Sequence, residues 1–499
     1  MPSIPDALDK FNHLTDALLE QLQRFLEAIA SLLPDARYRQ SFLQLVPAML
    51  AARSPRPATA AAHAPHPATT PWAVAKRFYS LLHTPRSSHR VWLGALYDEA
   101  VQQVAALPPG RRVLVAIDPM NLEKAYARKV EGICRVHKKT PPGSAPKKAR
   151  HKKEGRITWG YPTISAVALN TPQPALLYQR LFSYVTDDFI SQPWEWIETM
   201  RHLCQLLSGR KICIVADAEA DDQKLWREAQ QQELEIIVRA TRQRNIEVWN
   251  HRRRRWEPTA LQPLVKSLPG RCRFRKVFTH AGRTVPIEVT LDWFRFRLPD
   301  GSWTGWAVVA QTRVVGRDRP EDMWLPPLHI VLVTNRPVCR TRDAWKVYRD
   351  WSQRGQIELL YRFVQEDGLD AEAILLHDLE AFRRMLLLVW LAAFFVLRLE
   401  KWWCPVLIQW IRSLASSVVG TAMDRGGHYL LLRGLQRVVD GHALLEQIRI
   451  RPPPTRYLPP RDRHKLPHSQ NPLSPLSQPA ITGWTGKLVH PRLPASTAG

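Results

Sequence analysis

The spacing of hydrophobic residues divides the chain into a helical beginning, a mixed centre and a second helical stretch. Over residues 3–33, apolar side chains recur every three or four positions, which predicts an amphipathic helix. Residues 72–82 and 91–107 predict two further helices, and residues 378–448 a long apolar helical region. Residues 54–71 are rich in proline and alanine without any period, which predicts an extended linker.

The centre of the chain alternates short apolar runs with helical patterns. Two of these runs, residues 113–117 and 211–216, are each followed directly by an aspartate, Asp118 and Asp217. The order of predicted elements is three strands, helix, strand, helix, strand and then a final helix, which is the order of the ribonuclease-H-like fold. The other strands are expected at 161–170, 174–185 and 234–244, and the first helix at 193–209.

The final helix of that order is delayed by about a hundred residues, far more than an ordinary loop. Residues 271–315 alternate polar and apolar positions and contain Asp300-Gly301, a hairpin turn signal. We therefore expect an inserted domain that is mainly antiparallel β. At its entrance, residues 251–258 (HRRRRWEP) combine arginines with Trp256. This stretch suits stacking on an unpaired base, and a solvated basic turn fits it equally well.

The predicted fold class is α/β, with a ribonuclease-H-like core, a β-rich insertion, a helical N-terminal region and a helical C-terminal region. Basic loops between the short helices of residues 72–109 suit DNA-end recognition, although a plain helical bundle fits them as well. The predicted parts are an N-terminal helical region (1–53), a Pro/Ala-rich linker (54–71), a helical region for DNA-end binding (72–109), the catalytic core (110–241 and 327–400), the β-rich insertion (242–326), a C-terminal helical region (401–451) and a disordered, basic, Pro-rich tail (452–499).

The charge of the chain indicates a polyanionic partner. Its 499 residues include 71 Lys and Arg against 45 Asp and Glu, a formal charge of +26. Each basic side chain set against a phosphate releases condensed counterions, so nucleic acid is the first choice and an anionic membrane the second. The longest apolar run, Met385–Leu397, is shorter than the roughly 20 residues of a membrane span. We expect a buried core helix there, and a soluble cytoplasmic protein.

The candidate chemistry centres on a predicted helix over residues 345–366. On one helix, Trp351, Arg354, Glu358 and Gln365 share a narrow edge. Arg354 and Glu358 also fit an ordinary surface ion pair at i,i+4. The two upstream aspartates change this interpretation, because two strand-end carboxylates and one helix carboxylate together suit a divalent-metal site for phosphoryl transfer.

At these residues the sequence resembles the DDE transposases of bacterial insertion sequences, in the branch with a Tyr-x2-Arg-x3-Glu-x6-Lys signature. Here the signature reads Trp351-x2-Arg354-x3-Glu358-x6-Gln365, so the arginine and glutamate match and the other two positions differ. The resemblance covers roughly residues 110–400, and the branch carries a β-rich insert before its glutamate.

The resemblance implies a transposase that binds the terminal inverted repeats of its own element and catalyses DNA cleavage and strand transfer. Asp118, Asp217 and Glu358 would be catalytic and would hold Mg²⁺, with Mn²⁺ able to substitute. The implied partners are the element ends, the target DNA and a second copy of the chain in a synaptic homodimer, in the bacterial cytoplasm at the nucleoid, without a membrane. The candidate DNA-binding residues, some of them from a basic loop over residues 127–160, are Arg354, Trp351, Gln365, Arg239, Arg242, Arg244, Lys152 and Lys153.

Other functions stay open on the sequence alone. A ribonuclease-H-like nuclease or resolvase without strand transfer would need the same three carboxylates. A domesticated DNA-binding protein that has lost catalysis fits the changed positions Trp351 and Gln365. A basic structural protein of the nucleoid explains the charge but not the carboxylates. Inverted repeats flanking the gene would favour transposition.

Overall fold

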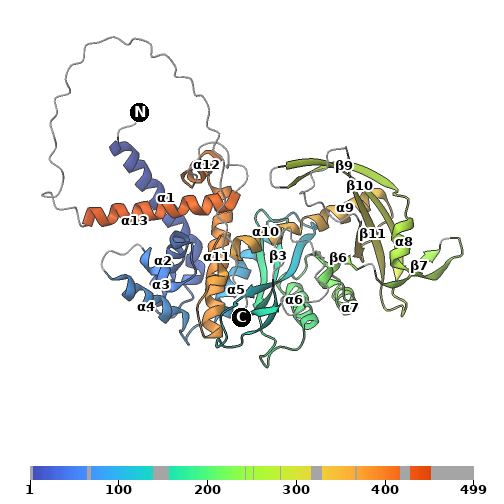
Figure 1. The fold of residues 1–499 in the computed structure, drawn as a ribbon, viewed down its shortest axis with the longest axis horizontal. Coiled ribbons are helices and arrows are strands. Elements are labelled where there is room, and N and C mark those ends of the chain that lie inside the picture. The colour runs from blue at the N-terminus through green and yellow to red at the C-terminus, as the bar shows by residue number, and fades with distance from the viewer. Residues whose placement is uncertain are drawn as a thin grey trace, which may run out of the picture. The chain divides into compact units, whose positions relative to one another are not determined.

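The computed structural model describes residues 4–64, 69–138, 157–241, 243–250, 252–280, 283–315, 329–365, 368–415 and 427–450 (Figure 1). All of these belong to one unit of the chain, Met1–Arg451. The tail expected over residues 452–499 lies outside the described residues. The described part is a mixed α/β fold with a large mixed sheet and a helical N-terminal region.

The N-terminal region is helical, and the expected amphipathic helix is present as α1. Its buried side chains include Leu18, Leu22 and Ile29, which follow the three- and four-residue spacing of the sequence. The two later helices that the sequence predicts correspond to α4 and α5. The five helices are α1 (Ile4–Ala30), α2 (Ala36–Ala52), α3 (Pro57–Ala62), α4 (Pro71–Leu82) and α5 (His89–Ala105).

The prediction of an extended linker over residues 54–71 is wrong in part, because a short helix, α3, forms inside this segment. Pro57 occupies the first helical position, where its missing N–H costs nothing. Ala60 and Ala61 are buried, and α3 contacts both α2 and α4. The small side chains that suggested a flexible linker instead allow three helices to approach closely.

The first six strands form the half of the sheet that carries both aspartates. β1 and β3 are antiparallel, and so are β3 and β4, whereas β1, β5 and β6 run parallel. The strands thus lie in the order β4-β3-β1-β5-β6, with β2 beside β4 at the same edge of β3. Their bounds are β1 (Val113–Glu123), β2 (Cys134–His137), β3 (Ile157–Ala168), β4 (Ala175–Leu181), β5 (Ile212–Ala216) and β6 (Glu235–Ala240).

The insertion is mainly antiparallel β, as expected, but it continues the same sheet. β12 pairs with β6, β11 pairs with β12, and β10 pairs with β11. The expected hairpin turn joins β10 to β11, and Gly301 has φ +69°, a conformation that favours glycine. The elements are β7 (Asn245–Asn250), β8 (Arg255–Ala260), α8 (Leu261–Ser267), β9 (Cys272–His280), β10 (Arg283–Arg297), β11 (Thr304–Val314) and β12 (His329–Thr334).

Helices cover both faces of the sheet, and the alternation of side chains along each strand decides which residues meet them. Leu114 and Ala116 enter the core that includes α9, α10 and α11, whereas Val113 and Val115 enter the core that includes α6, α7 and α8. We call the first of these the α10 face. The remaining bounds are α6 (Gln192–Leu206), α7 (Gln223–Gln231), α9 (Thr341–Ser352), α10 (Gly355–Gln365) and α11 (Leu379–Trp402).

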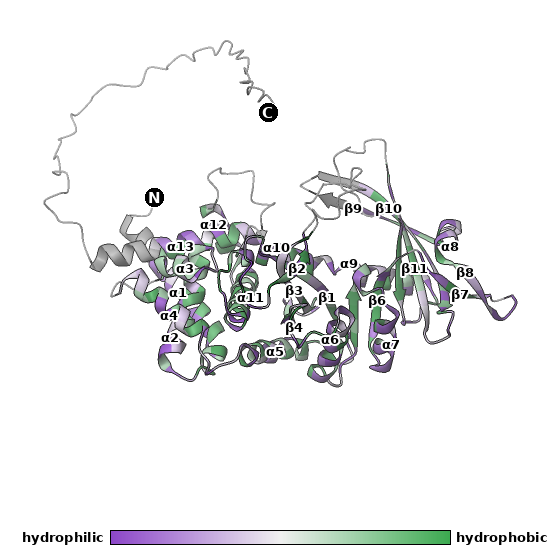
Figure 2. Cartoon of the chain, turned by 60° about the horizontal axis from the view of Figure 1, so that its bottom comes forward, coloured by the Kyte–Doolittle hydropathy of each residue, from purple (hydrophilic) through white to green (hydrophobic). Residues whose placement is uncertain are grey.

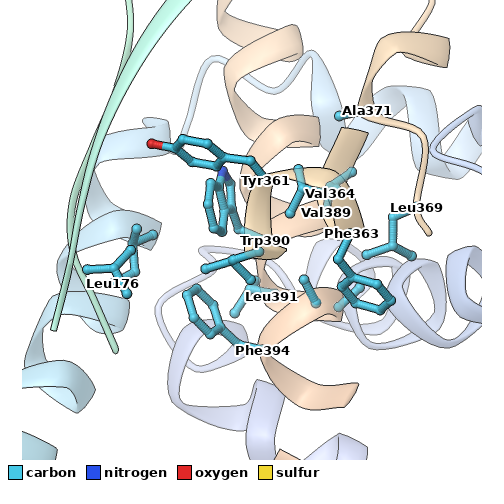
Figure 3. Close-up of a cluster of buried hydrophobic side chains, with 14 of the residues drawn as sticks. Leu176, Tyr361, Phe363, Val364, Leu369, Ala371, Val389, Trp390, Leu391 and Phe394 are labelled. Atoms are coloured by element: carbon cyan, nitrogen blue, oxygen red, sulfur yellow. The ribbon is translucent and has the colours of Figure 1, made fainter. Parts of the chain in front are cut away.

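The apolar run of Met385–Leu397 lies within α11 and is a buried core helix, as expected. α11 contacts α2, α4 and α5 of the N-terminal region and also α10. Between α10 and α11, Tyr361, Val364 and Phe363 pack in a cluster with Trp390 and its neighbours (Figure 3). The C-terminal helices α12 (Pro405–Leu414) and α13 (Gly427–Ile450) follow, and α13 contacts α1 and α2. Of the described helices, none is long and apolar enough to cross a membrane.

Candidate active site

Asp118 and Asp217 lie at the same level on neighbouring parallel strands. The pairing of β1 with β5 matches Ala116 to Val215, and continuing this register by two residues sets Asp118 opposite Asp217. Adjacent strands are about 4.8 Å apart, so the two carboxylates lie side by side where the pairing of β1 with β5 ends. The expectation that β1 ends at Asp118 is wrong, because β1 continues to Glu123 in antiparallel pairing with β3. Asp118 instead marks the point just past the β1–β5 pairing.

The helix expected over residues 345–366 is broken into two. α9 ends at Ser352 and α10 begins at Gly355. Between them, the N–H of Arg354 donates to the carbonyl of Trp351 at 3.1 Å, which is the tighter i,i+3 bond of a 3₁₀ turn. Glycine, the poorest non-proline helix former, follows directly. Arg354 therefore lies in the break, where its side chain can turn towards the strand ends.

The Arg354 side chain joins the two halves of the site. Its guanidinium forms ion pairs with Asp217 at 3.3 Å and with Glu358, one turn into α10. Arg239, on β6, pairs with the other oxygen of Asp217 at 3.3 Å. Asp217 and Glu358 keep 27% and 46% of their side-chain surface exposed, so both are accessible to a ligand.

Trp351 holds the end of α9 against the sheet. Its side chain is buried, and its indole Nε1 donates to the carbonyl of Ala216 at 3.1 Å. The Arg354 guanidinium lies over the indole ring, 5.0 Å from the centroid. The expected contact between Trp351 and DNA is therefore not supported, because the ring is occupied by β5 on one side and by Arg354 on the other.

Gln365 also differs from the expected role. The side chain is 5% exposed, and its amide Nε2 donates to the carbonyl of Asn121 on β1 at 2.9 Å. A contact with a DNA phosphate would require this residue to leave the protein interior. Gln365 instead fastens the end of α10 to β1.

Two residues of the site were not foreseen from the sequence. The hydroxyl of Tyr361 donates to the carbonyl of Asp118, and Figure 3 shows it directed away from the α11 cluster. Glu219 follows Asp217 by two residues and lines a cavity of about 350 Å³ together with His137, Trp196 and Asp222. The sequence held one usable signal for each: Tyr361 is three residues after Glu358 on one helix, and Glu219 lies in the turn after β5.

The charges show that the expected carboxylates are brought together. Burial raises the pKa of Asp118 well above its ordinary value, and the nearby carboxylates Glu219, Glu358 and Asp217 raise it further. Among these neighbours, the Arg354 guanidinium alone lowers the pKa of Asp118. The pKa of Glu219 is raised by its own burial and by Asp217. Carboxylates that are close enough to perturb one another are typical of a functional site.

The donor set has the chemical character that Mg²⁺ prefers, because carboxylate oxygens are hard ligands. Within the described residues, no group of three or more His, Cys, Asp or Glu side chains is arranged to hold a metal ion as it stands. A cation does lie among the carboxylates, however, since the Arg354 guanidinium bridges Asp217 and Glu358. Metal binding would therefore require Arg354 to release both carboxylates, and Arg239 to yield an oxygen of Asp217.

The other predicted DNA-binding residues divide into three cases. Arg239 is part of the site through its ion pair with Asp217. Arg244 is 13% exposed, pairs with Asp221 at 2.8 Å and stacks on Trp226, so it stabilises the fold and is not free for DNA. The expected contact between Arg244 and DNA is therefore not supported. The remaining three, Arg242, Lys152 and Lys153, lie outside the described residues.

Comparison with known proteins adds a distant likeness to solved structures. No protein-family model matches the sequence, and no curated protein matches it. Among solved structures, the chain is similar to a piggyBac transposase in a synaptic complex with hairpin DNA, studied by cryo-EM. The TM-score is 0.35 and the identity 12%, over 77% of this chain and 66% of that one. A likeness this distant transfers neither residues nor activity.

Proposed function

We propose that the chain is a DDE-type DNA transposase with a ribonuclease-H-like core. The strand order β4-β3-β1-β5-β6 supports this fold, since the first three strands are antiparallel and the last three parallel. The observation that carries the function is the meeting of Asp118, Asp217 and Glu358 around Arg354 at one edge of the sheet. The enzyme would bind the terminal inverted repeats of its own insertion sequence, cleave there and join the freed 3′-hydroxyl to target DNA.

In this proposal Asp118, Asp217 and Glu358 hold Mg²⁺, which Mn²⁺ can replace. Two such ions would activate the attacking oxygen and stabilise the leaving oxygen of an in-line displacement. Arg354 would then grip a phosphate beside the cleaved bond, because a planar guanidinium binds phosphate with two parallel hydrogen bonds. Its stacking on Trp351 holds the guanidinium plane in place before DNA arrives.

The partners follow from charge and from the reaction. A formal charge of +26 favours a nucleic acid, and the two ends of one element require two active sites, which a homodimer supplies. The protein would act in the bacterial cytoplasm, at the nucleoid. Trp351 and Gln365, the two residues that depart from the signature, are buried and do not replace any of the three carboxylates or Arg354. Both departures are therefore compatible with an active enzyme.

The direct test replaces Glu358 with glutamine, which keeps the shape of the side chain and removes the charge that a metal needs. The substrate is a duplex carrying the DNA that borders the gene, incubated with target plasmid and Mg²⁺. We expect DNA binding to survive, because it depends on lysine and arginine, while cleavage and strand transfer fall by orders of magnitude.

A matched control is Glu27→Gln, which removes the same charge from an exposed position on α1 and should leave both steps unchanged. Cleavage by Glu358→Gln at the unmodified rate would overturn the catalytic assignment. Cleavage without any joined product from the unmodified protein would instead identify a nuclease that lacks strand transfer.

A further inference from the structure

The β7–β8 hairpin ends the sheet with a cluster of arginines. Arg252, Arg253, Arg254 and Arg255 are all exposed, and Glu257 is the acidic residue that faces them. Figure 2 shows this end of the hairpin as strongly hydrophilic beside the apolar strands of the sheet. Four positive charges against one negative charge make it a candidate surface for a polyanion.

The tip is organised by hydrogen bonds, which distinguishes it from a loose basic loop. The side-chain oxygen of Asn250 accepts from the N–H groups of Arg252 and Arg253 at 3.0 and 3.1 Å. The Asn250 amide donates to Glu257 at 2.9 Å. Glu257 in turn pairs with Arg253 and Arg255, each at 3.2 Å. Two arginines are thereby used to fix the tip.

The other two arginines are left for a ligand. Neither Arg252 nor Arg254 forms an ion pair with any described acidic residue. Arg254 has φ +49°, a left-handed conformation that L residues seldom adopt. Arg254 is thus an exposed arginine at a turn position where glycine or asparagine would be less strained.

The tryptophan beside the tip has a different role from the base stacking considered for it. Trp256 lies opposite Trp249 in the β7–β8 ladder, with ring centroids 5.3 Å apart. Arg297 and Arg295 lie over the same ring, 5.0 and 5.6 Å from its centroid. The ring is half-buried by its own neighbours and stiffens the hairpin. Arg295 and Arg297 lie beside it, and Arg297 also pairs with Glu247.

Arg295 and Arg297, beside the hairpin, lie on the same face of the continuous sheet as the carboxylates. Alternation along β10 sets Arg295 and Arg297 on the side of Trp293, which belongs to the core of the α10 face. Asp118 and Arg239 are on that face too, by the same alternation along β1 and β6. In the sheet, the strands β12, β11, β10 and β7 lie between β6, which carries Arg239, and β8. These five strand spacings of about 4.8 Å give roughly 24 Å, the length of about seven base pairs.

We propose that the β7–β8 hairpin binds duplex DNA away from the point of cleavage, with Arg252 and Arg254 contacting backbone phosphates. A two-stranded antiparallel ribbon is of the size that the major groove of B-DNA admits. The proposal rests on the proposed function for its ligand, DNA, and adds a second contact surface that the three carboxylates do not provide.

The test compares Arg252→Gln/Arg254→Gln with the unmodified chain. A control, Arg24→Gln/Arg37→Gln, removes two exposed charges from the N-terminal helices, each of which pairs with an acidic residue close by in the sequence. The probe is a 30-base-pair duplex of random sequence without Mg²⁺, and the dissociation constant is measured over a series of salt concentrations. The logarithm of the association constant falls linearly with the logarithm of the salt concentration, and each lost phosphate contact makes this slope less steep by about 0.9. For the hairpin variant we expect the magnitude of the slope to decrease by roughly 1.8. The control should keep the unmodified slope.

An unchanged slope in the hairpin variant, or an equal decrease in the control, would overturn the proposal. In that case the arginines only keep the edge strand β8 from pairing with another chain. A second probe, one strand of the same duplex, tests the preference for duplex DNA. A decrease seen with the single strand alone would also overturn the proposal.

The two proposals fail in different ways. If the unmodified protein cleaves end DNA and the hairpin variant keeps its slope, only the hairpin proposal fails. If the slope decreases as expected but no protein cleaves DNA in Mg²⁺, only the transposase proposal fails.

Discussion

Arg354 is the residue whose removal tests the metal proposal without any measurement of activity. Its guanidinium pairs with Asp217 and Glu358 and also lies near Asp118, so it neutralises charge that a metal would otherwise neutralise. Replacing it with glutamine keeps a hydrogen-bond donor and removes the charge. Arg239 still pairs with Asp217, but Glu358 and Asp118 lose their neighbouring positive charge, so the carboxylates repel one another more strongly until another cation binds.

The size of the effect follows from distance and exposure. A pair of unit charges at the 3.3 Å between Arg354 and Asp217 corresponds to roughly 5 kcal/mol at an effective dielectric constant of 20. Solvent screens both carboxylates, since Glu358 is 46% and Asp217 27% exposed. Measured pairs of this kind contribute up to about 1 kcal/mol each. We therefore expect the free energy of unfolding of Arg354→Gln to fall by about 1–2 kcal/mol without metal.

The assay is denaturant unfolding in EDTA and again in a series of Mg²⁺ concentrations. A ligand that binds only the folded state adds RT ln(1 + [L]/Kd), which is about 2.7 kcal/mol at a hundred times Kd. Mg²⁺ should stabilise the variant more than the unmodified chain, because Arg354 no longer has to be displaced and only Arg239 still pairs with Asp217. The difference in stability should therefore close. Arg349→Gln is the control, since Arg349 is 55% exposed and pairs with Asp350, away from the three carboxylates. A stability difference that Mg²⁺ leaves unchanged would refute metal binding at these carboxylates.

Two further predictions concern buried polar groups. Glu195 is 1% exposed beside Arg180, and burial raises its pKa to about 7 from 4.5, so its stabilising contribution is complete below pH 4.5 and is lost as the pH rises through 7. The free energy of unfolding of Glu195→Gln, measured with urea, should therefore equal that of the unmodified chain near pH 4.5. At pH 8 it should be about 2–3 kcal/mol larger than that of the unmodified chain. The same difference at both pH values would contradict this. Gln365→Lys, which restores the lysine of the signature, should leave the affinity for end DNA unchanged. It should cost about 1–3 kcal/mol of stability, because it buries a charge where Gln365 now binds the Asn121 carbonyl. Tighter binding of cleaved end DNA would show that position 365 reaches the backbone of the DNA.

The sequence predicted the order of the elements because each strand and helix carries its own periodicity. The aspartates were found for the same reason, since each follows a run of apolar residues. The length of β1 was missed, because Pro119 and Asn121 are turn formers when taken alone. In the structure they are held in the strand by antiparallel pairing with β3, a contact between residues more than forty positions apart. Local patterns do not contain that information.

The break between α9 and α10 was missed for a related reason. A single glycine within an amphipathic pattern costs only about 1 kcal/mol in a helix, so the pattern predicted one continuous helix. Packing decides otherwise. Trp351 is fixed to β5 and Ile357 is buried in the core of the α10 face, and the two helices meet these positions separately. The sequence also could not show that β12 would pair with β6 and merge the insertion with the core sheet.

The two departures from the signature can now be explained by what their side chains contact. Trp351 donates to the carbonyl of Ala216, the residue before Asp217, and Gln365 donates to the carbonyl of Asn121, three residues after Asp118. Between them, Tyr361 donates to the carbonyl of Asp118 itself. Three side chains from α9 and α10 thus hold the backbone of the two strands at the points where the aspartates project. Because these bonds end on main-chain carbonyls, they fix the positions of Arg354 and Glu358 relative to both aspartates without using any carboxylate oxygen that a metal would need.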